Sequence, residues 1–521
     1  MCKKIIALVI ALSLLLTGCS SIQLNLKNGS SDSSFVSMES EPYLNYEVPT
    51  SLPHVLVDQL GYLPHSTKGV FFCGTLLPSK FNLVDANTGS VVYVGATENK
   101  GHSDELDCNI AYGEFSEVVS PGTYYVEAQY LGRSFTFEIN DHIYDELFKE
   151  ACKTYYYNRC GMTLTENFAG ANAHNACHTG TAVLREDMTV NKDVTGGWHQ
   201  DSSGSKDIIS SAKTLGNMLL AYEVFPAAFT DEIGIPESGN EIPDILDEAK
   251  YEIDWLLKMQ NEETGAVYSK LTVAENAEKK TTLMYVEDAD IESTRAFAFA
   301  LAKFSYLYQN YDKEYATSCL KAADRAWKYA ILNEGAEDKD SPSKAAAAAE
   351  IYRASGLKEC ENYLNDFLER KLYADTLDEI SFYACVTYLN TKLKVNPVYC
   401  EEIIKLIMNR AEDISEQSRS STFLVPGKLD EDNNVELLEN MINMSLVDHI
   451  IANHEYDTII ENYLHYFLGR NSRSITFLDN VGSYSYMEVH EALGLMKQFD
   501  VDAKLIFMLS KIVSKDGFVE E

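Results

Sequence analysis

Two cysteines and two histidines in the middle of the chain have the side chains that bind transition metals. Cys160, Cys177, His178 and His199 supply two thiols and two imidazoles. This is the ligand set of a closed structural zinc site, in which four protein ligands leave no position for water. Sixteen residues lie between the cysteines and 20 between the histidines, which is not the spacing of a zinc finger. Two alternatives stay open: a disulfide between Cys160 and Cys177, or separate buried thiols beside a hydrogen-bonded histidine.

The purpose of such a site would be mechanical, because an ion with four protein ligands cannot activate water. It would fix the loop that follows His199.

An export signal opens the chain. Two lysines precede an apolar run over residues 5–16, which is too short to span a membrane. The following Leu16-Thr17-Gly18-Cys19 resembles a bacterial lipobox, in which cleavage before the cysteine exposes a thiol that receives diacylglycerol. We therefore expect residues 1–18 to be a lipoprotein signal peptide, and lipidated Cys19 to hold the protein on the cell envelope, outside the cytoplasm. An ordinary signal peptide with a chance cysteine is the alternative.

The net charge of the chain limits its partners, and the number of its cysteines limits its disulfide bonds. The 521 residues carry a formal net charge of −36, from 79 acidic against 43 basic side chains. Such a charge repels nucleic acid and anionic lipid, so a neutral partner is favoured. Apart from Cys2 and Cys19, nine of the eleven cysteines are scattered along the chain, an odd number that argues against a disulfide scaffold.

The N-terminal part of the mature chain predicts a tether and a β-domain. Residues 19–52 are rich in Ser and Asn and lack a sustained apolar period, which is typical of a flexible segment. Over residues 53–140, short alternating runs divided by turn residues predict a small β-sandwich. The runs 124–129 and 134–139 flank Gly132 as a hairpin.

From residue 141 to 521 the apolar period becomes helical. Residues 243–260 show the pattern, with Pro243 near the first turn and apolar side chains spaced to bury one stripe. Similar stripes recur over residues 294–308, 315–331, 344–354, 379–389, 402–414, 436–451, 458–467 and 502–513. About a dozen helices with short loops suit a toroid of paired helices. The period alone does not separate a toroid from another large helical domain.

Short motifs along the chain make the prediction more specific. They are residues 55–64, Asn158-Arg159-Cys160-Gly161, Ala176-Cys177-His178, Gly196-Gly197-Trp198-His199, Pro236 to Asn240, Ile242-Pro243-Asp244, Trp255 to Gln260 and Leu468-Gly469-Arg470-Asn471. In this order they resemble glycoside hydrolase family 9, the endoglucanase-type family, with the immunoglobulin-like module that precedes many of its catalytic domains.

The resemblance implies a multidomain α and β protein. An Ig-like β-sandwich would be followed by a large (α/α)6 helical barrel, whose cleft binds β-1,4-linked glucan and hydrolyses it with inversion. It also implies zinc on the four residues named first, which match zinc ligands of family members that carry these motifs. Glu237, Asn240 and Asp244 offer oxygen ligands of the type that calcium prefers, but helix capping explains them at least as well.

The catalytic carboxylates of the family are missing at the matching positions. Inverting hydrolysis needs a base and an acid whose carboxyl groups stand roughly 6.5 to 9.5 Å apart. The family places its water-handling aspartates in an Asp-Ala-Gly-Asp loop, where this sequence reads Gln200-Asp201-Ser202-Ser203. The base position is therefore Ser203, with Gln200 as its partner. Matching the family's final Asn-Ala to Asp502-Ala503 puts the acid at Met496.

Three functions stay open at this point. The leading hypothesis is a surface lipoprotein that binds β-glucan or a related polysaccharide, with the usual hydrolysis lost or strongly altered. The second is an active β-glycosidase in which Asp201 or Asp207 acts as a displaced base and Glu488 or Glu491 as the acid. The third is a structural cell-surface protein that contacts another protein through its helical body.

Overall fold

The computed structural model describes residues 46–49, 52–104, 106–276, 281–335, 341–372, 377–427, 431–478, 481–482 and 499–514. The chain divides into two compact units. Unit 1 comprises Met1–Ile143, Glu412–Leu437 and Glu455–Gly494, and unit 2 comprises Tyr144–Ala411, Leu438–His454 and Leu495–Glu521. The sandwich therefore shares unit 1 with two later helical segments. In the described part of the chain, no helix combines the length and apolarity needed to cross a membrane.

The β-strands of unit 1 form an immunoglobulin-like sandwich. They are β1 (Val55–Leu56), β2 (Gly61–Tyr62), β3 (Gly69–Gly74), β4 (Lys80–Asp85), β5 (Val91–Ser103), β6 (Cys108–Glu114), β7 (Gly122–Ala128), β8 (Gly132–Arg133) and β9 (Phe137–Ile139). Their order is β1-β3-β6-β5-β4-β7-β9-β2, with β8 paired to β7. The long β5 pairs with β4 through its first half and with β6 through its second half, so it runs along both layers. The expected hairpin around Gly132 is confirmed by the pairing of β7 with β8 and β9.

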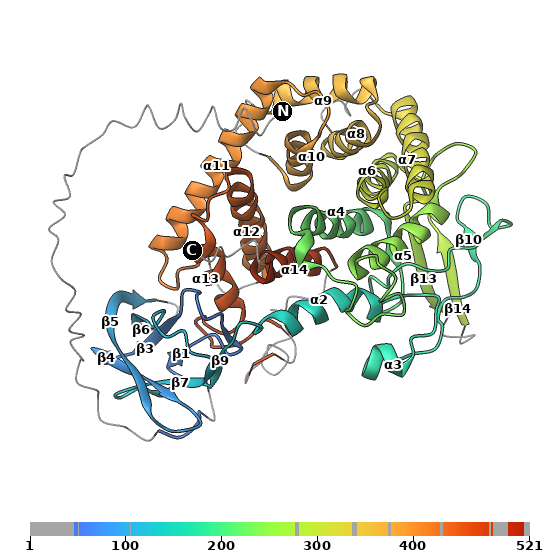
Figure 1. Ribbon diagram of the computed structural model, residues 1–521. Helices are drawn as coiled ribbons and strands as arrows, with labels where there is room; N and C mark the ends of the chain where they lie inside the picture. The colour runs from blue at the N-terminus through green and yellow to red at the C-terminus, as the bar shows by residue number, and fades with distance from the viewer. Residues whose placement is uncertain are drawn as a thin grey trace. The chain divides into compact units, whose positions relative to one another are not determined.

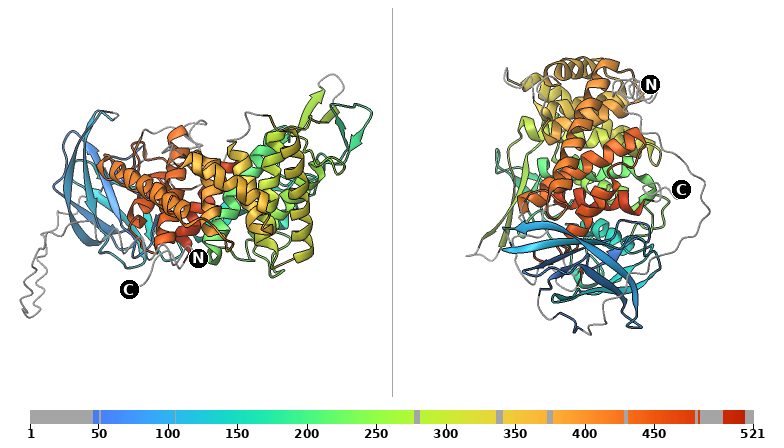
Figure 2. Two further views of the ribbon diagram at one scale, coloured as in Figure 1. Left: turned by 90° about the horizontal axis from the view of Figure 1, so that it is seen from above. Right: turned by 90° about the vertical axis from the view of Figure 1, so that its left-hand side faces the viewer.

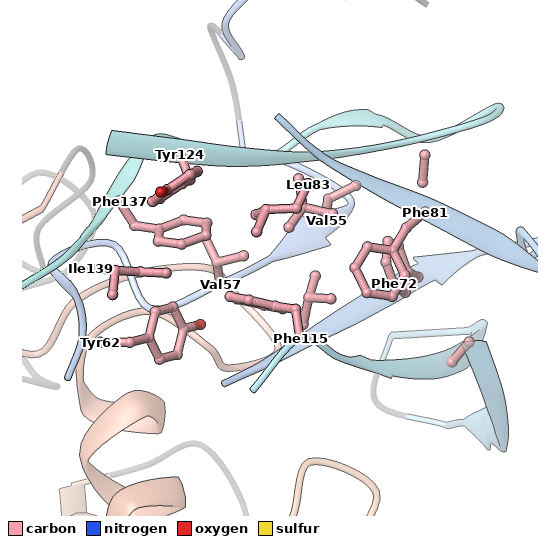
Figure 3. Packing of buried hydrophobic residues seen from close by; sticks show 14 residues of the cluster. Val55, Val57, Tyr62, Phe72, Phe81, Leu83, Phe115, Tyr124, Phe137 and Ile139 are labelled. Atoms are coloured by element: carbon pink, nitrogen blue, oxygen red, sulfur yellow. The ribbon is translucent and has the colours of Figure 1, made fainter. Parts of the chain in front are cut away.

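Alternate side chains of these strands fill the space between the layers. Tyr62, Phe115 and Phe137 pack edge to face, with ring centroids 5.4 Å and 5.2 Å from Tyr62 (Figure 3). The aromatic edges point at the ring faces, which is the favoured geometry for such pairs. Tyr62 also donates a hydrogen bond from its hydroxyl to the carbonyl of Gly69 at 3.0 Å, so its polar end is satisfied inside the core.

Helix α13 (Asp457–Phe467) belongs to unit 1 through buried polar contacts. Nδ1 of His465 lies 2.8 Å from a carboxylate oxygen of Asp58, and both side chains are buried. Asp58 also accepts the backbone N–H groups of Leu60 and Gly61. This contact explains why a helix far along the sequence packs with the first strands.

Unit 2 is built on a ring of helices (Figure 1). The inner ones are α4 (Ile208–Val224), α6 (Ile291–Tyr308), α8 (Pro342–Ser355), α10 (Glu379–Asn390), α12 (Glu431–Ile451) and α14 (Phe499–Val513). Contacts join α4 to α6, α6 to α8, α8 to α10 and α14 to α4. Lys504 of α14 closes the ring through ion pairs with Glu379 of α10 and Glu439 of α12. The others are α2 (Asp145–Tyr157), α3 (Glu166–Ala169), α5 (Asp244–Met259), α7 (Lys313–Asn333), α9 (Lys358–Lys371) and α11 (Pro397–Ser420). The end of α11 from Glu412 and the start of α12 up to Leu437 belong to unit 1.

The N-termini of three inner helices share one capping pattern. Asp207, Asp290 and Asp378 precede α4, α6 and α10, and each is followed three residues later by a serine. Each aspartate accepts a hydrogen bond from the backbone N–H of that serine, at 3.0, 2.7 and 2.9 Å respectively. Such a cap satisfies one of the unpaired N–H groups in the first turn and sets where the helix begins.

Unit 2 also contains a sheet, where the sequence period predicted only helices. Its strands are β10 (Ala182–Leu184), β11 (Asn191–Lys192), β12 (Lys206–Asp207), β13 (Lys270–Asn276) and β14 (Thr281–Val286), in the order β11-β10-β14-β13-β12. It lies at one edge of the helices of unit 2 (Figure 2). Leu271 and Val273 are buried and alternate with polar neighbours, a pattern that is typical of a strand and that the prediction of helices overlooked.

Candidate metal centre and the loop it holds

Two backbone segments are paired so that Cys160 and His199 lie together. Cys160 follows the end of α2, and its N–H donates to the carbonyl of Gly197 at 2.8 Å. The N–H of His199 donates to the carbonyl of Asn158 at 2.9 Å, and Arg159 and Trp198 form an antiparallel bridge between these contacts. Because of this antiparallel pairing, the side chains of Cys160 and His199 lie on the same side of the two segments.

The four residues expected to bind a metal are brought together by the fold. Cys177 and His178 come from the loop before β10 and meet the other two, so that one ligand atom from each residue lies within 4.8 Å of all the others. The Sγ atom of Cys160 is 3.5 Å from Nδ1 of His178, and Sγ of Cys177 is 3.2 Å from Nε2 of His199. The arrangement is that of a possible metal-binding group.

The alternative disulfide is not formed. The Sγ atoms of Cys160 and Cys177 are 3.9 Å apart, and both residues are free cysteines. A disulfide needs a separation of about 2.05 Å. The geometry therefore favours two independent thiol ligands.

The electrostatics of the cluster also suit a cation. Burial, together with the nearby His178 and Lys206, lowers the pKa of His199 to about 4, so the imidazole is neutral and able to donate a lone pair. Burial raises the pKa of the Cys160 thiol to about 11, although Lys206 opposes the rise. A bound metal ion would supply the positive charge that a buried thiolate needs.

The loop after His199 packs directly on the cluster at Gly204. This glycine has a φ of +87°, and a Cβ atom placed on it would stand 2.4 Å from Cε1 of His178. The close approach leaves no room for a side chain. The loop and the cluster of candidate metal ligands are therefore in direct contact.

Gln200 is held inside the loop by its own side chain. Its Nε2 donates to Oγ of Ser211 at 2.7 Å, and its Oε1 accepts the backbone N–H of Asp207 at 2.7 Å. Both ends of the amide are used to join the start of the loop to the start of α4. Gln200 therefore has a structural role, because its side chain fixes the loop relative to α4.

Asp201 and Ser203 form a turn within the loop. Oδ1 of Asp201 accepts hydrogen bonds from N–H and Oγ of Ser203, at 2.8 and 2.6 Å, and from N–H of Ser205 at 3.0 Å. Partial burial raises the pKa of Asp201, but these hydrogen bonds outweigh it and hold the pKa below its usual value. Asp201 is therefore an ionised acceptor that shapes the turn.

The other candidate carboxylates have different outcomes. Asp207 is the N-cap of α4, accepting the N–H of Ser210 at 3.0 Å. Glu488 and Glu491, together with Met496 at the expected acid position, lie outside the described residues, as does Cys19. Asp207 thus has a structural role in α4, and the acid side of the prediction is untested.

Sequence reasoning missed a buried glutamate beneath the loop. Glu252 of α5 accepts the N–H of Trp198 at 2.7 Å through Oε2 and the hydroxyl of Ser211 at 2.6 Å through Oε1. Burial raises its pKa to about 7. Its signal in the sequence was the pair of Glu248 and Glu252, four residues apart on the apolar face of their helix, since a buried carboxylate must have partners.

The three oxygen-bearing residues considered for calcium are used within the protein. Glu237 pairs with Arg159 through both carboxylate oxygens, at 2.8 and 3.1 Å. The amide of Asn240 donates to Asp247 at 3.0 Å, and Asp244 accepts from the N–H of Ile233 at 2.7 Å. Among the described residues, only the cysteine and histidine cluster brings three or more His, Cys, Asp or Glu side chains close enough together to hold an ion.

A small cavity of about 50 Å³ lies at the N-terminal ends of the inner helices, close to the loop in sequence. Its floor is apolar, and Phe299 stacks on Tyr383 there with ring centroids 5.7 Å apart. Lys213, Glu292 and Ser343 supply polar groups around it. Mostly apolar linings with a few polar side chains are usual in ligand sites, but such sites typically measure roughly 300 to 1,000 Å³, several times the volume of this cavity.

The fold and the loop define the class of protein as a helical-barrel protein with an N-terminal immunoglobulin-like module. The profile of glycosyl hydrolase family 9 matches residues 144–500, and that of the cellulase N-terminal ig-like domain matches residues 50–133. The chain belongs to glycosyl hydrolase family 9, and the expected architecture of sandwich and (α/α)6 barrel is confirmed.

Similar proteins agree with this assignment. Endoglucanase D of Acetivibrio thermocellus is 27% identical over 475 residues, which cover 84% of this chain and 74% of the relative. A metagenome-derived family 9 endoglucanase superposes with a TM-score of 0.77 at 23% identity, over 88% of this chain and 99% of the other. A zinc-binding triple mutant of the family 9 endoglucanase J30 superposes with a TM-score of 0.76 at 21% identity, over 87% and 100%. At such identities the two structures demonstrate a shared fold.

Proposed function

We propose that this protein is an exported, lipid-anchored member of glycosyl hydrolase family 9 that binds β-glucan, with inverting hydrolysis lost or strongly reduced. One observation carries the proposal. At the positions of the family's water-handling aspartates stand Gln200 and Ser203, and both side chains are committed to hydrogen bonds within the loop.

The chemistry explains why this matters. A general base must take a proton from water near neutral pH, which neither an amide nor a serine hydroxyl can do unaided. A positioned acid or base typically contributes roughly 10² to 10⁴ in rate. Loss of the base alone would therefore reduce turnover by at least roughly a hundredfold.

Displaced carboxylates are the alternative, and the contacts weigh against them on the base side. Asp201 uses Oδ1 to hold Ser203 and Ser205, and Asp207 caps α4. A residue that fixes a turn or a helix start would have to give up those contacts to activate water. A role for Glu488 or Glu491 as acid is a separate hypothesis, because both lie outside the described residues.

We further propose that the metal is zinc and that its role is structural. For a tetrahedral ion with Zn–S of about 2.3 Å and Zn–N of about 2.0 Å, the ligand atoms would be roughly 3.3 to 3.8 Å apart. The distances of 3.9, 3.5 and 3.2 Å in the cluster support this geometry. Cys160, Cys177, His178 and His199 would hold the ion, and its binding would fix the loop through His178 and Gly204. The zinc-binding relative is consistent with a metal on this fold.

A neutral polysaccharide is the partner that the site and the charge favour. The cavity at the helix N-termini has the Phe299 and Tyr383 rings in its floor, and the net charge of −36 disfavours anionic ligands. The relative named endoglucanase D is an enzyme that acts on glucan. We extend a preference for β-glucan to this chain as part of the proposal.

The test pairs a sensitive reducing-end assay with titration calorimetry on cello-oligosaccharides. We expect binding without appreciable turnover by the wild type. Activity should be restored by Gln200→Asp with Ser203→Asp, and with Met496→Glu in addition, if the protein is a hydrolase that has lost its catalytic residues. Robust turnover by the wild type would refute the loss of hydrolysis. Absence of both binding and turnover would favour a structural surface protein.

Lipid attachment has its own test. A fatty-acid probe fed to cells producing the full chain should label the wild type, and Cys19→Ala should abolish the label because no thiol remains at the lipobox. Label that persists in the variant would contradict the lipobox prediction.

A further inference from the structure

A second cavity, of about 170 Å³, lies inside the helical ring between α10, α12 and α14. We call it the α10 pocket. Its polar lining residues are Asn217, Asp378, Glu379, Tyr383, Arg410, Glu439 and Lys504. A cavity needs only roughly 10 to 15 Å³ to hold one water molecule, so this one has space for a much larger guest.

The pocket is open at one end and closed at the other. Its outer residues lie at the N-terminus of α10, where Asp378 is exposed and the Glu379 side chain is 22% exposed. Asn217, at its inner end, is 1% exposed.

A buried ion network joins α4, α6 and α8. Farther along α4, Glu223 pairs with Lys303 at 2.9 Å, and Lys303 also pairs with Glu350 at 3.3 Å. Arg353 completes the network with Glu350 at 2.5 Å. Because Asn217 at the inner end of the α10 pocket is buried, the pocket could admit only the end of a chain.

Ion pairs hold three of the charged side chains of the lining in place, while one buried hydrogen-bond donor has no partner among the described residues. Lys504 is held between Glu379 and Glu439, at 2.9 and 2.8 Å, so three charged side chains from three helices are fixed in place. Asn217 accepts the hydroxyl of Tyr383 at 2.5 Å, while its Nδ2 has no hydrogen-bond partner among the described residues. A buried amide donor without a partner is destabilising, and an acceptor on a ligand would remove that cost.

The chemistry of the lining selects a neutral ligand with many hydroxyl groups. Carboxylates of Glu379 and Glu439 accept hydrogen bonds, and Asn217, Arg410 and Lys504 donate them. Three acidic side chains, Asp378, Glu379 and Glu439, face two basic ones, Arg410 and Lys504, so the lining has little net charge to attract a strongly charged guest. The Tyr383 ring adds an apolar surface of the kind that packs on sugars.

We propose that the α10 pocket binds the terminal sugar unit of a saccharide chain, so that the protein recognises chain ends. This rests on the proposed saccharide-binding function and adds a site and a mode of binding to it.

The test uses titration calorimetry on the zinc-loaded mature chain with three probes. They are cellohexaose, cellohexaose reduced to its alditol, and cellohexaose with a bulky acetal on its non-reducing terminal sugar. We expect one of the two end modifications to lower the affinity at least tenfold. Equal affinity for all three probes would overturn end recognition while leaving saccharide binding intact. If the wild type binds none of the probes, the end-binding proposal and the saccharide-binding function both fall.

A pair of variants locates the site. Asn217→Leu removes the unpaired donor and also the acceptor of the Tyr383 hydroxyl, which lies 3.1 Å from Glu379 as a second acceptor. The variant should lower the affinity for cellohexaose at least tenfold, with thermal unfolding measured to show that it is folded. Asn443→Leu is the matched control, because Asn443 is also a buried asparagine of unit 2 whose amide has no partner among the described residues, but it does not line the pocket. A purely structural Asn217 would leave affinity unchanged in both variants, and that result would overturn the proposal.

Discussion

The backbone of Gly204 lies against the imidazole of His178, so closely that a Cβ atom at this position would stand 2.4 Å from Cε1. One of the four expected metal ligands thus lies against the loop over residues 200–204, where the resemblance to the family predicts catalytic aspartates. The sequence places 25 residues between these two positions and gives no sign of the contact. The relationship ties the order of the loop to the order of the metal cluster.

Gly204→Ala should therefore disturb the metal cluster. The added methyl group meets the ring of His178, and the positive φ adds roughly 1 to 2 kcal/mol of backbone strain. Gly89→Ala is the matched control, since Gly89 has a φ of +70° and a Cβ atom added there would have nothing within 4 Å. We expect a larger loss of thermal stability, and weaker metal retention on dialysis, for Gly204→Ala alone. Equal losses in the two variants would argue against the contact.

The metal itself gives the second prediction. The purified mature chain should carry about one zinc ion, measured by elemental analysis after dialysis. His199→Ala should lower the metal content and the melting temperature together, because metal-binding energy is coupled to folding. His142→Ala, which changes an exposed histidine of unit 1, should leave both unchanged. A metal-free protein of full stability would refute the prediction.

Two substitutions of Asp207 distinguish a capping role of this residue from a catalytic one. Asparagine caps helices as well as aspartate does, so Asp207→Asn should keep the stability of α4 and any residual hydrolysis, whereas Asp207→Ala should cost roughly 1 kcal/mol. Asp312→Ala, at the N-cap of α7, is the control for the cost of losing a cap. Thermal unfolding and the reducing-end assay are the measurements. A loss of turnover in Asp207→Asn would identify the carboxylate as a displaced base.

Glu461 of α13 predicts a pH dependence of stability in unit 1. Burial raises the pKa of Glu461 to about 7, despite a hydrogen bond from the N–H of Thr67 and the nearby Lys68. The folded chain therefore keeps this proton to higher pH than the unfolded chain, whose glutamate titrates near 4.5. The contribution of Glu461 to the free energy of unfolding should fall as the pH rises from 4.5 to 7, by about 3 kcal/mol in all.

Glu461→Gln removes this titration and should flatten the dependence of melting temperature on pH over that window. Glu416→Gln, at an exposed glutamate of the same unit, should leave the slope as it is in the wild type. Identical slopes in the wild type and in Glu461→Gln would contradict the assignment.

The sequence by itself determined the order of the domains and the chemistry of the metal ligands. Alternating runs such as those of β7 and β9 predict strands, because strand side chains point to opposite faces, and the apolar stripe of α5 predicts a helix with one buried side. The types of Cys160, Cys177, His178 and His199 limit the ion they could bind. The absence of carboxylates at Gln200 and Ser203 is likewise a property of the sequence.

Only the tertiary structure decided what the remaining side chains do. The roles of Asp207 as a helix cap, of Glu252 as a buried support and of Asp58 as the partner of His465 depend on backbone N–H groups and side chains that only the folded chain brings together. The β13 and β14 strands form because their edges pair with β12 and β10, a long-range condition that local periodicity does not contain. Hydrogen-bond partners and close contacts are set by how helices and strands meet in space, whereas residue type and period are local.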